Sequence, residues 1–426
     1  MTAKSPQARR ALFFATIAFA VNFSIWTLYA VMAIELKNTL GLSATHFGLL
    51  LSAPILTGTL LRLPIGLLCE RYSSRNLFIG QMLLVIPALL ALSRADSYKD
   101  YLLLGLAFGI SGASFTIGIS YITDWFRRDG QGTAMGIFGA GNAGAALTFI
   151  CVPFIIHTWG WQAIGPVYAL VIGLTVFLFA LFTPRLPAHL AQHKQQQSMR
   201  DILTPLLQGK VWRFGLYYYF VFGSFLALLL WLPQYFVQAY SLPMHQAMAL
   251  TLLFVSTSSI ARAIGGWFSD RYGGRAVNWS VFWICLVCLF FLSYPPTTMT
   301  IHGAYRDVDL SIALNLWIFL TLLLIVGIAQ GFGRASVYKI INDYYPNQMG
   351  SVGGMVAMLG ALGGCTLPVM FGALIDLAGI YSACFMLLYA VLAGCMILMH
   401  LAIRHERYQN RLHHAIENNF LHQDRD

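Results

Sequence analysis

Long apolar runs follow one another along most of the chain, separated by short polar breaks. Each run holds about 20 residues, the length that a helix needs to cross a hydrocarbon core of roughly 30 Å. Hydrophobic residues make up 58% of the 426 residues and charged residues only 10%, a composition that excludes a soluble globular protein. The chain is therefore predicted to be an all-α membrane protein with twelve transmembrane helices.

We expect the twelve spans at residues 11–36, 47–68, 77–93, 101–123, 132–157, 163–183, 214–238, 246–269, 277–295, 311–341, 350–375 and 380–403. A polar, Gln-rich stretch at 184–213 divides them into six and six. The predicted organisation is an N-terminal six-helix bundle at 1–183, a cytoplasmic linker at 184–213, a C-terminal six-helix bundle at 214–403 and a cytoplasmic tail at 404–426.

The net charge of +10 follows the expected loops. Most of the 26 Lys and Arg fall on one side of the membrane when the loops are counted from an internal N-terminus. The basic residues expected on the other side are Lys37, Arg94, Lys99 and Arg306. This asymmetry predicts a multi-pass inner-membrane protein with both termini in the cytoplasm, and it leaves no excess charge that would indicate nucleic-acid binding.

Two segments 200 residues apart are alike: TLLRLPIGLLCERYSSR at 59–75 and SIARAIGGWFSDRYGGR at 259–275. The matched pairs are Arg62 and Arg262, Gly66 and Gly266, Glu70 and Asp270, Arg71 and Arg271, and Arg75 and Arg275. Agreement in charge, glycine and spacing at one offset indicates two homologous halves.

The element G-x-x-x-(D/E)-R-x-x-x-R, at Gly66–Arg75 and again at Gly266–Arg275, resembles the loop motif of the major facilitator superfamily. The resemblance extends from about residue 11 to residue 403, as judged from the expected spans. It implies two pseudo-symmetric six-helix bundles around a central substrate path, which open alternately to either side of the lipid bilayer, and a monomeric protein.

Arg62 and Arg262 each precede an acidic interface residue by eight positions, which places them roughly 12 Å inside the membrane. An unpaired charge at that depth costs at least about 2.5–3.5 kcal/mol. Snorkelling to the interface is one explanation. The alternative is a bound anion, because none of the 16 acidic residues falls near the middle of an expected span. A planar guanidinium suits a planar oxyanion.

A third basic residue, Arg334 in GFGRASVYK, also falls within a span. Snorkelling, orientation of the helix and a functional role all remain open for it, and we do not assign it to the binding site.

Glycines are concentrated in spans five and eleven. They let neighbouring helices approach closely, either as static packing or as a sliding interface that gates the path. Their equivalent places in both halves favour gating. The predicted gating glycines are Gly136, Gly139, Gly141, Gly144, Gly354, Gly360, Gly363 and Gly364.

These stretches, with L-L-R-L-P around Arg62 and A-R-A-I-G-G around Arg262, resemble the nitrate/nitrite porter family. The resemblance implies that both arginines grip nitrate or nitrite and that Asn142 hydrogen-bonds it. The residues that look like the pocket and gate aromatics of that family are Phe115, Tyr29, Tyr218 and Phe222. We expect the neighbouring aromatics Trp26, Tyr217 and Tyr219 to be packing residues.

Many family members carry Gly-Asn-Gly where this chain has Gly333-Arg334-Ala335. The basic residue resembles the branch described as nitrate/proton symporters, so protons are an expected second partner, with nitrate/nitrite antiport and transport of another small organic anion as alternatives. Without an output domain a sensor is disfavoured. We expect no enzyme, metal site or cofactor, because no nucleophile–base set or ligand cluster occurs, and the seven cysteines are read as packing residues.

Overall fold

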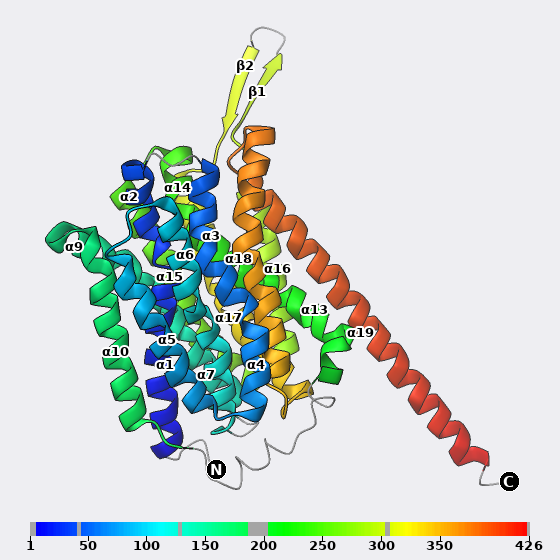
Figure 1. Ribbon diagram of the computed structural model, residues 1–426. Helices are drawn as coiled ribbons and strands as arrows, with labels where there is room; N and C mark the ends of the chain where they lie inside the picture. Colours follow the sequence, from blue (N-terminus) through cyan, green and yellow to red (C-terminus); the bar gives the residue numbers. More distant parts are fainter. Residues whose placement is uncertain (1–5, 41–43, 127–129, 186–202, 303–306, 424–426) are drawn as a thin grey trace.

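The computed structural model describes residues 6–40, 44–126, 130–185, 203–302 and 307–423. Twelve helical segments among them are long and apolar enough to cross a bilayer, as the sequence predicted. They form one upright bundle, with the chain ends toward one end of it and a hairpin at the other (Figure 1). We call these the motif end, which carries Gly66–Arg75 and Gly266–Arg275, and the hairpin end.

The elements of the N-terminal half are α1 (Pro6–Trp26), α2 (Tyr29–Leu40), α3 (Ala44–Leu60), α4 (Arg62–Arg71), α5 (Ser74–Leu92), α6 (Tyr98–Phe108), η1 (Gly109–Ala113), α7 (Ser114–Thr123), α8 (Gln131–Gly139), η2 (Ala140–Ala143), α9 (Gly144–Trp159), η3 (Trp161–Ala163) and α10 (Ile164–Phe182). Several spans contain more than one element because short 3₁₀ turns interrupt the α-helix.

The elements of the C-terminal half are η4 (Thr204–Leu207), α13 (Gly209–Tyr218), η5 (Tyr219–Gly223), α14 (Ser224–Tyr240), α15 (Met244–Tyr272), α16 (Gly274–Leu292), β1 (Thr297–His302), β2 (Asp307–Ile312), α17 (Leu316–Tyr344), α18 (Ser351–Ala378) and α19 (Ala383–Gln423). Most of the linker predicted at 184–213 lies outside the described residues. The halves meet chiefly where α15 packs on α8 and α18 packs on α4.

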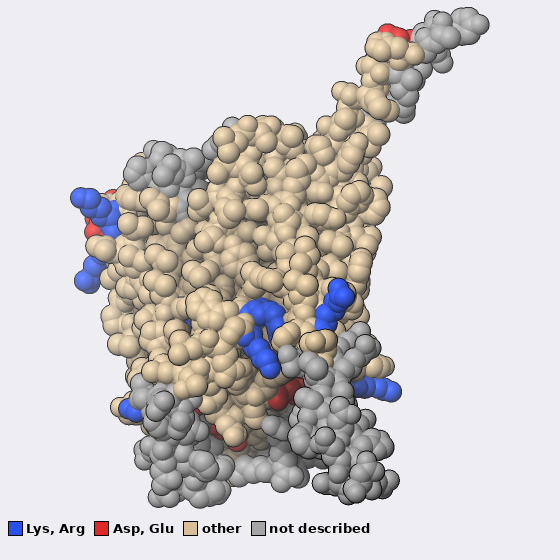
Figure 2. Space-filling view, turned by 90° about the vertical axis from the view of Figure 1, so that its right-hand side faces the viewer, with Lys and Arg blue, Asp and Glu red and all other residues tan. Residues whose placement is uncertain are grey.

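The outer surface of the bundle is mainly apolar. Figure 2 shows a broad tan face on which most charged side chains gather in the lower part or along the left edge. Leu84, Leu170 and Phe177 are among the large side chains that point outward. Such a surface is suited to lipid, where apolar side chains need no cover from other protein.

One predicted span boundary was wrong. The tenth span does not begin at 311, because residues 307–312 form β2, which pairs antiparallel with β1. Helix α17 begins at Leu316, where the side chain of Asn315 accepts a hydrogen bond from the N–H of Trp317 at 2.9 Å. The apolar part of the last helix, Ala383–His405, agrees with the span predicted at 380–403, and α19 continues beyond it to Gln423 and projects away from the bundle (Figure 1).

At the motif end the backbones of the two halves touch. Gly66 lies against Gly350 and Gly354, and Gly266 lies against Gly132 and Gly136 in the same way. A Cβ on Gly66 or Gly266 would overlap a backbone carbonyl oxygen of the opposite half. Glycine is therefore required at both matched positions of the repeat for this close approach.

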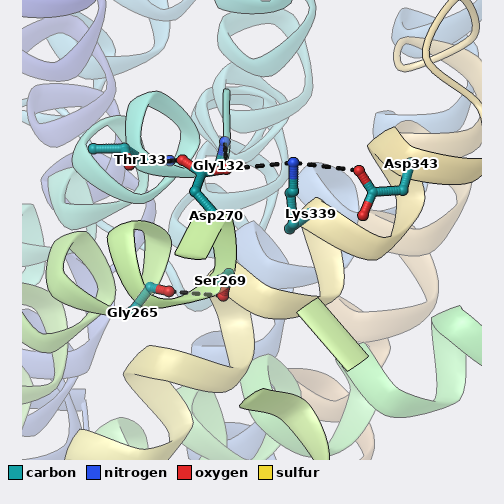
Figure 3. Close-up of polar contacts among 7 residues, drawn as sticks. All are labelled: Gly132, Thr133, Gly265, Ser269, Asp270, Lys339 and Asp343. Atoms are coloured by element: carbon teal, nitrogen blue, oxygen red, sulfur yellow. Dashed lines mark hydrogen bonds and ion pairs between the residues drawn. The ribbon is translucent and has the colours of Figure 1, made fainter. Parts of the chain in front are cut away.

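Each half also presents a carboxylate to a helix N-terminus of the other half. Asp270 accepts hydrogen bonds from the N–H groups of Gly132 and Thr133 at 3.0 and 2.7 Å, near the start of α8 (Figure 3). Glu70 accepts one from the N–H of Ser351 at 2.9 Å, at the start of α18. These N–H groups have no partner within their own helix, and the helix dipole favours negative charge there. The contacts hold the motif end closed.

Lys339 adds a contact in one half. Its Nζ lies 3.4 Å from Oδ1 of Asp270 and 3.3 Å from Oδ1 of Asp343 (Figure 3). It thus shares its charge between the carboxylate that closes the interface and one on its own helix.

We expect Asp270→Asn to open the motif end. The amide of Asn is uncharged, so it accepts these hydrogen bonds more weakly than the carboxylate does. Charge-assisted hydrogen bonds contribute about 1.5–3 kcal/mol each. The measurement is the distance between spin labels at the exposed positions Tyr72 and Tyr272, obtained by double electron–electron resonance. This distance should become longer in the variant. Asp343→Asn, which leaves the interface carboxylate intact, is the matched control. Identical distance distributions in both variants would argue against the closing role of Asp270.

Candidate functional site

The two repeat-matched arginines approach the same aromatic ring. Arg62 is the first residue of α4 and Arg262 lies within α15, and neither is more than 1% exposed. Their Cζ atoms lie 5.6 and 4.8 Å from the centre of the Phe115 ring. Both guanidiniums are therefore in the interior, and snorkelling does not describe them.

Arg62 bonds to both halves. Its Nε donates to the carbonyl oxygen of Gly112 at 3.1 Å, and its Nη1 donates to that of Ala357 in α18 at 3.0 Å. Its Cζ also lies 4.9 Å from the ring of Trp26 and 5.1 Å from that of Phe222. Aromatic faces stabilise a desolvated cation, but they supply no neutralising charge.

Arg262 bonds to a residue of its own half and to one of the opposite half. Its Nη2 donates to the hydroxyl of Tyr218 at 3.3 Å. When the Asn142 amide is oriented to satisfy its hydrogen bonds, its oxygen accepts from Nη1 of Arg262 at 2.8 Å. The guanidinium passes directly over Gly139, where a Cβ would overlap it.

The guanidinium of Arg334 also lies in this cluster. The sequence alone did not assign Arg334 to the site. It lies on α17 with no exposed surface. Its Nη1 donates to the same Asn142 oxygen at 2.8 Å, and its Nη2 donates to the Oγ of Ser258 at 2.7 Å. The feature of the sequence that could have indicated this is the small residues on either side of Arg334, which also flank Arg262 and leave room for a buried guanidinium.

Aromatic rings pack around the arginines. Tyr218 stacks on Phe222 with ring centres 5.2 Å apart, and Tyr338 packs edge-on against Phe115 and Tyr218, each at 5.1 Å. The hydroxyl of Tyr338 donates to the carbonyl oxygen of Gly353 at 2.9 Å. Tyr338 was not predicted, since an aromatic residue is unremarkable in a chain that is 14% aromatic.

Two neighbouring aromatics exchange their expected places. Tyr29 lies away from the arginines, with its hydroxyl donating to the carbonyl oxygen of Tyr101 at 2.5 Å and its ring against Phe108. Trp26, expected as a packing residue, is the ring beside Arg62. The cause is the break between α1 and α2 after Trp26, which ends the regular helical spacing between the two side chains.

Helix irregularities place much of this site. A turn at Leu61 separates α3 from α4 immediately before Arg62, η1 precedes Phe115, and Asn142 lies within η2. The π-helical turn η5 follows Tyr218 and contains Phe222. Irregular turns inside membrane helices redirect side chains and free carbonyl groups, such as that of Gly112, to accept hydrogen bonds.

The site is strongly positive. Of the side chains that the structure describes, Glu70 is the one buried carboxylate, and it lies at the motif end. Two buried donors, Nη2 of Arg62 and Nε of Arg262, have no hydrogen-bond partner among the described residues. A small anion between them would satisfy both donors and supply the missing negative charge.

The predicted gating glycines occupy two kinds of place. Gly136, Gly139 and Gly354 lie where the halves meet, against Arg262 and Gly266 or against Arg62 and Gly66. The others lie within one half: Gly141 and Gly144 against α1, and Gly360, Gly363 and Gly364 against α13, η5 and α14. Close approach is seen at all of them, and movement stays a prediction.

The chain is similar in sequence to known transport proteins. The profile of the Major Facilitator Superfamily matches residues 12–305. The probable nitrate/nitrite antiporter NarK1 of Thermus thermophilus is 36% identical over 93% of this chain and 92% of its own. The nitrite extrusion protein of Bacillus subtilis is 27% identical over 90% and 92%, and the probable nitrate transporter NarT of Staphylococcus epidermidis is 25% identical over 85% and 88%.

Among solved structures, the crystal structure of the human organic anion transporter MFSD10 (TETRAN) superposes with a TM-score of 0.72. The match covers 93% of this chain and 100% of that one, at 16% sequence identity. At this identity the likeness concerns the fold.

The contact between Gly139 and Arg262 gives a stability prediction. Gly139→Ala forces the guanidinium out of its place, and we expect the protein to lose about 1–3 kcal/mol of stability, as for other overpacked sites. Gly173→Ala is the matched control, because a Cβ there meets nothing within 4 Å and alanine favours the helix. Thermal unfolding of the purified variants measures both, and equal midpoints would contradict the predicted contact.

Proposed function

Because the chain belongs to the major facilitator superfamily and, within it, to the nitrate/nitrite porter family, we propose that it is a secondary transporter that moves nitrate and/or nitrite across a membrane by alternating access. The observation that carries the proposal is the pair of buried, repeat-matched arginines, each bonded to the opposite half. An anion bound between them contacts both six-helix bundles, which move relative to each other in alternating access.

The chemistry of the site supports a small planar oxyanion. Its free donors are N–H groups of guanidinium forks, and aromatic rings enclose them closely. Nitrate and nitrite are flat, carry one charge and accept hydrogen bonds in their plane, which suits such donors. The rings of Phe115 and Phe222 lie against the guanidinium groups, so we expect a flat ion to fit among them better than a bulky carboxylate.

For coupling, we propose exchange of one anion for another. Arg62 and Arg262 repel each other across the interface, and a bound anion removes the repulsion, so the loaded protein changes conformation more readily than the empty one. Proton symport is the second candidate, and the sequence Gly333-Arg334-Ala335, which resembles the symporter branch, favours it.

The distribution of basic residues supports an orientation. We place the motif end and both termini in the cytoplasm of a cell whose inner membrane holds the protein, because most loop Lys and Arg belong to that end. The cytoplasmic contacts of Glu70 and Asp270 then close the path on the inside.

The proposed site predicts the effect of conservative substitutions. Proteoliposomes that contain the unmodified chain and are loaded with nitrite should take up ¹⁵N-nitrate, and Arg62→Lys or Arg262→Lys should reduce uptake by about 100-fold or more, because an ammonium lacks the planar fork. Arg94→Lys, at an exposed position, is the control and should transport normally. Uptake that survives in both site variants would disprove the site. Excess nitrite should compete, and a dicarboxylate should not.

Coupling is decided by recording external pH and nitrate uptake together. Exchange predicts that uptake requires nitrite or nitrate inside the vesicles and leaves the pH unchanged. Uptake into empty vesicles with alkalinisation outside would contradict exchange and establish proton symport.

A further inference from the structure

A single anion bound between Arg62 and Arg262 does not require a third arginine, yet Arg334 lies beside them. It brings a third buried positive charge into a region where the described side chains contribute no carboxylate. One nitrate would neutralise only one of the three charges. The inference below rests on the proposed function and concerns how many anions the same site holds.

The third guanidinium is fixed and points at one place. Its Nε donates to the carbonyl oxygen of Gln330 at 3.3 Å, and its Nη2 donates to the carbonyl oxygen and Oγ of Ser258 at 2.9 and 2.7 Å. Its Cζ lies 3.9 Å from the centre of the Phe225 ring. These contacts leave Nη1 directed at Asn142.

At the side chain of Asn142, two guanidinium groups donate to one uncharged amide oxygen. The Nη1 atoms of Arg262 and Arg334 both lie 2.8 Å from the amide oxygen of Asn142, so they are no farther apart than twice that distance. An amide oxygen has only a partial charge, and the two cations repel each other in a low-dielectric interior. A point where two guanidinium donors converge in this way is a binding place for an anion.

A second anion at this point requires the Asn142 side chain to turn away from it. It lies in the 3₁₀ segment η2 between α8 and α9, and its side-chain oxygen is the group that the two arginines share. Rotation of one side chain would expose both Nη1 donors, with the hydroxyl of Tyr218 bonded to the same guanidinium of Arg262.

We propose that the site holds two small monovalent anions at once. The first lies between Arg62 and Arg262, against the donors Nη2 of Arg62 and Nε of Arg262 that have no partner in the described part of the chain. The second lies between Arg262 and Arg334, in the place of the Asn142 oxygen. Arg262 is common to both positions, and two anions leave one net positive charge where one anion leaves two.

The ligand of the second position is an oxyanion or a halide. It must be small, because the side chains that surround it are buried, and it must accept hydrogen bonds from two converging N–H groups. Nitrate, nitrite and chloride share this chemistry, and the composition of the buffer distinguishes the oxyanions from chloride.

The test is the number of nitrate ions bound per chain. We would saturate the full-length protein in lipid nanodiscs with ¹⁵N-nitrate by equilibrium dialysis, in sodium gluconate and separately in sodium chloride. Two nitrates per chain in gluconate support the proposal. A fall to one in chloride means that chloride occupies the second position. One nitrate in both buffers overturns the proposal, whereas none in either overturns the proposed function itself.

Two variants assign the second position. Arg334→Gln removes one of its charges, and Asn142→Asp fixes a carboxylate of the same size between the two guanidiniums, so each should bind one nitrate in gluconate. Two nitrates bound by Asn142→Asp would contradict the location even if Arg334→Gln fails to fold.

Discussion

The structure depends on positive charge that is buried beside no carboxylate among the side chains that the structure describes. Arg62, Arg262 and Arg334 are held by carbonyl groups, hydroxyls and aromatic rings, which orient them and stabilise them only in part. Each such charge costs at least about 2.5–3.5 kcal/mol on the insertion scale. We propose that a mobile anion offsets this cost when it binds and that the protein thereby favours the loaded state.

We propose that the same residues connect anion binding to a motion of the halves. Arg62 bonds to α18 of the C-terminal half, and Arg262 bonds to Asn142 of the N-terminal half. Along the same helices toward the motif end, Glu70 and Asp270 bond to α18 and α8, again across the interface. The glycine contacts between these helices bring the backbones together, and we expect a change at the arginines to be transmitted through these packed helices to the closed end.

The internal repeat explains how much of this could be predicted. Matched segments located Arg62, Arg262 and the interface glycines, because homologous halves place equivalent residues about one axis. Arg334 has no partner in the repeat, and depth along a helix does not tell which way a side chain points. Tyr29 was misplaced and the contact of Trp26 with Arg62 was missed because the helix breaks between the two aromatics. The hairpin was missed because alternating apolar residues in β2 extended the hydrophobic run of α17.

The central claim is that an anion neutralises these arginines, and thermal unfolding of the purified protein tests it most directly. Nitrate at about 100 times its Kd should raise the free energy of unfolding by about 2.7 kcal/mol, seen as a higher midpoint than in gluconate of equal ionic strength. The same midpoint in both salts, with nitrate raised to molar concentration, would contradict the account.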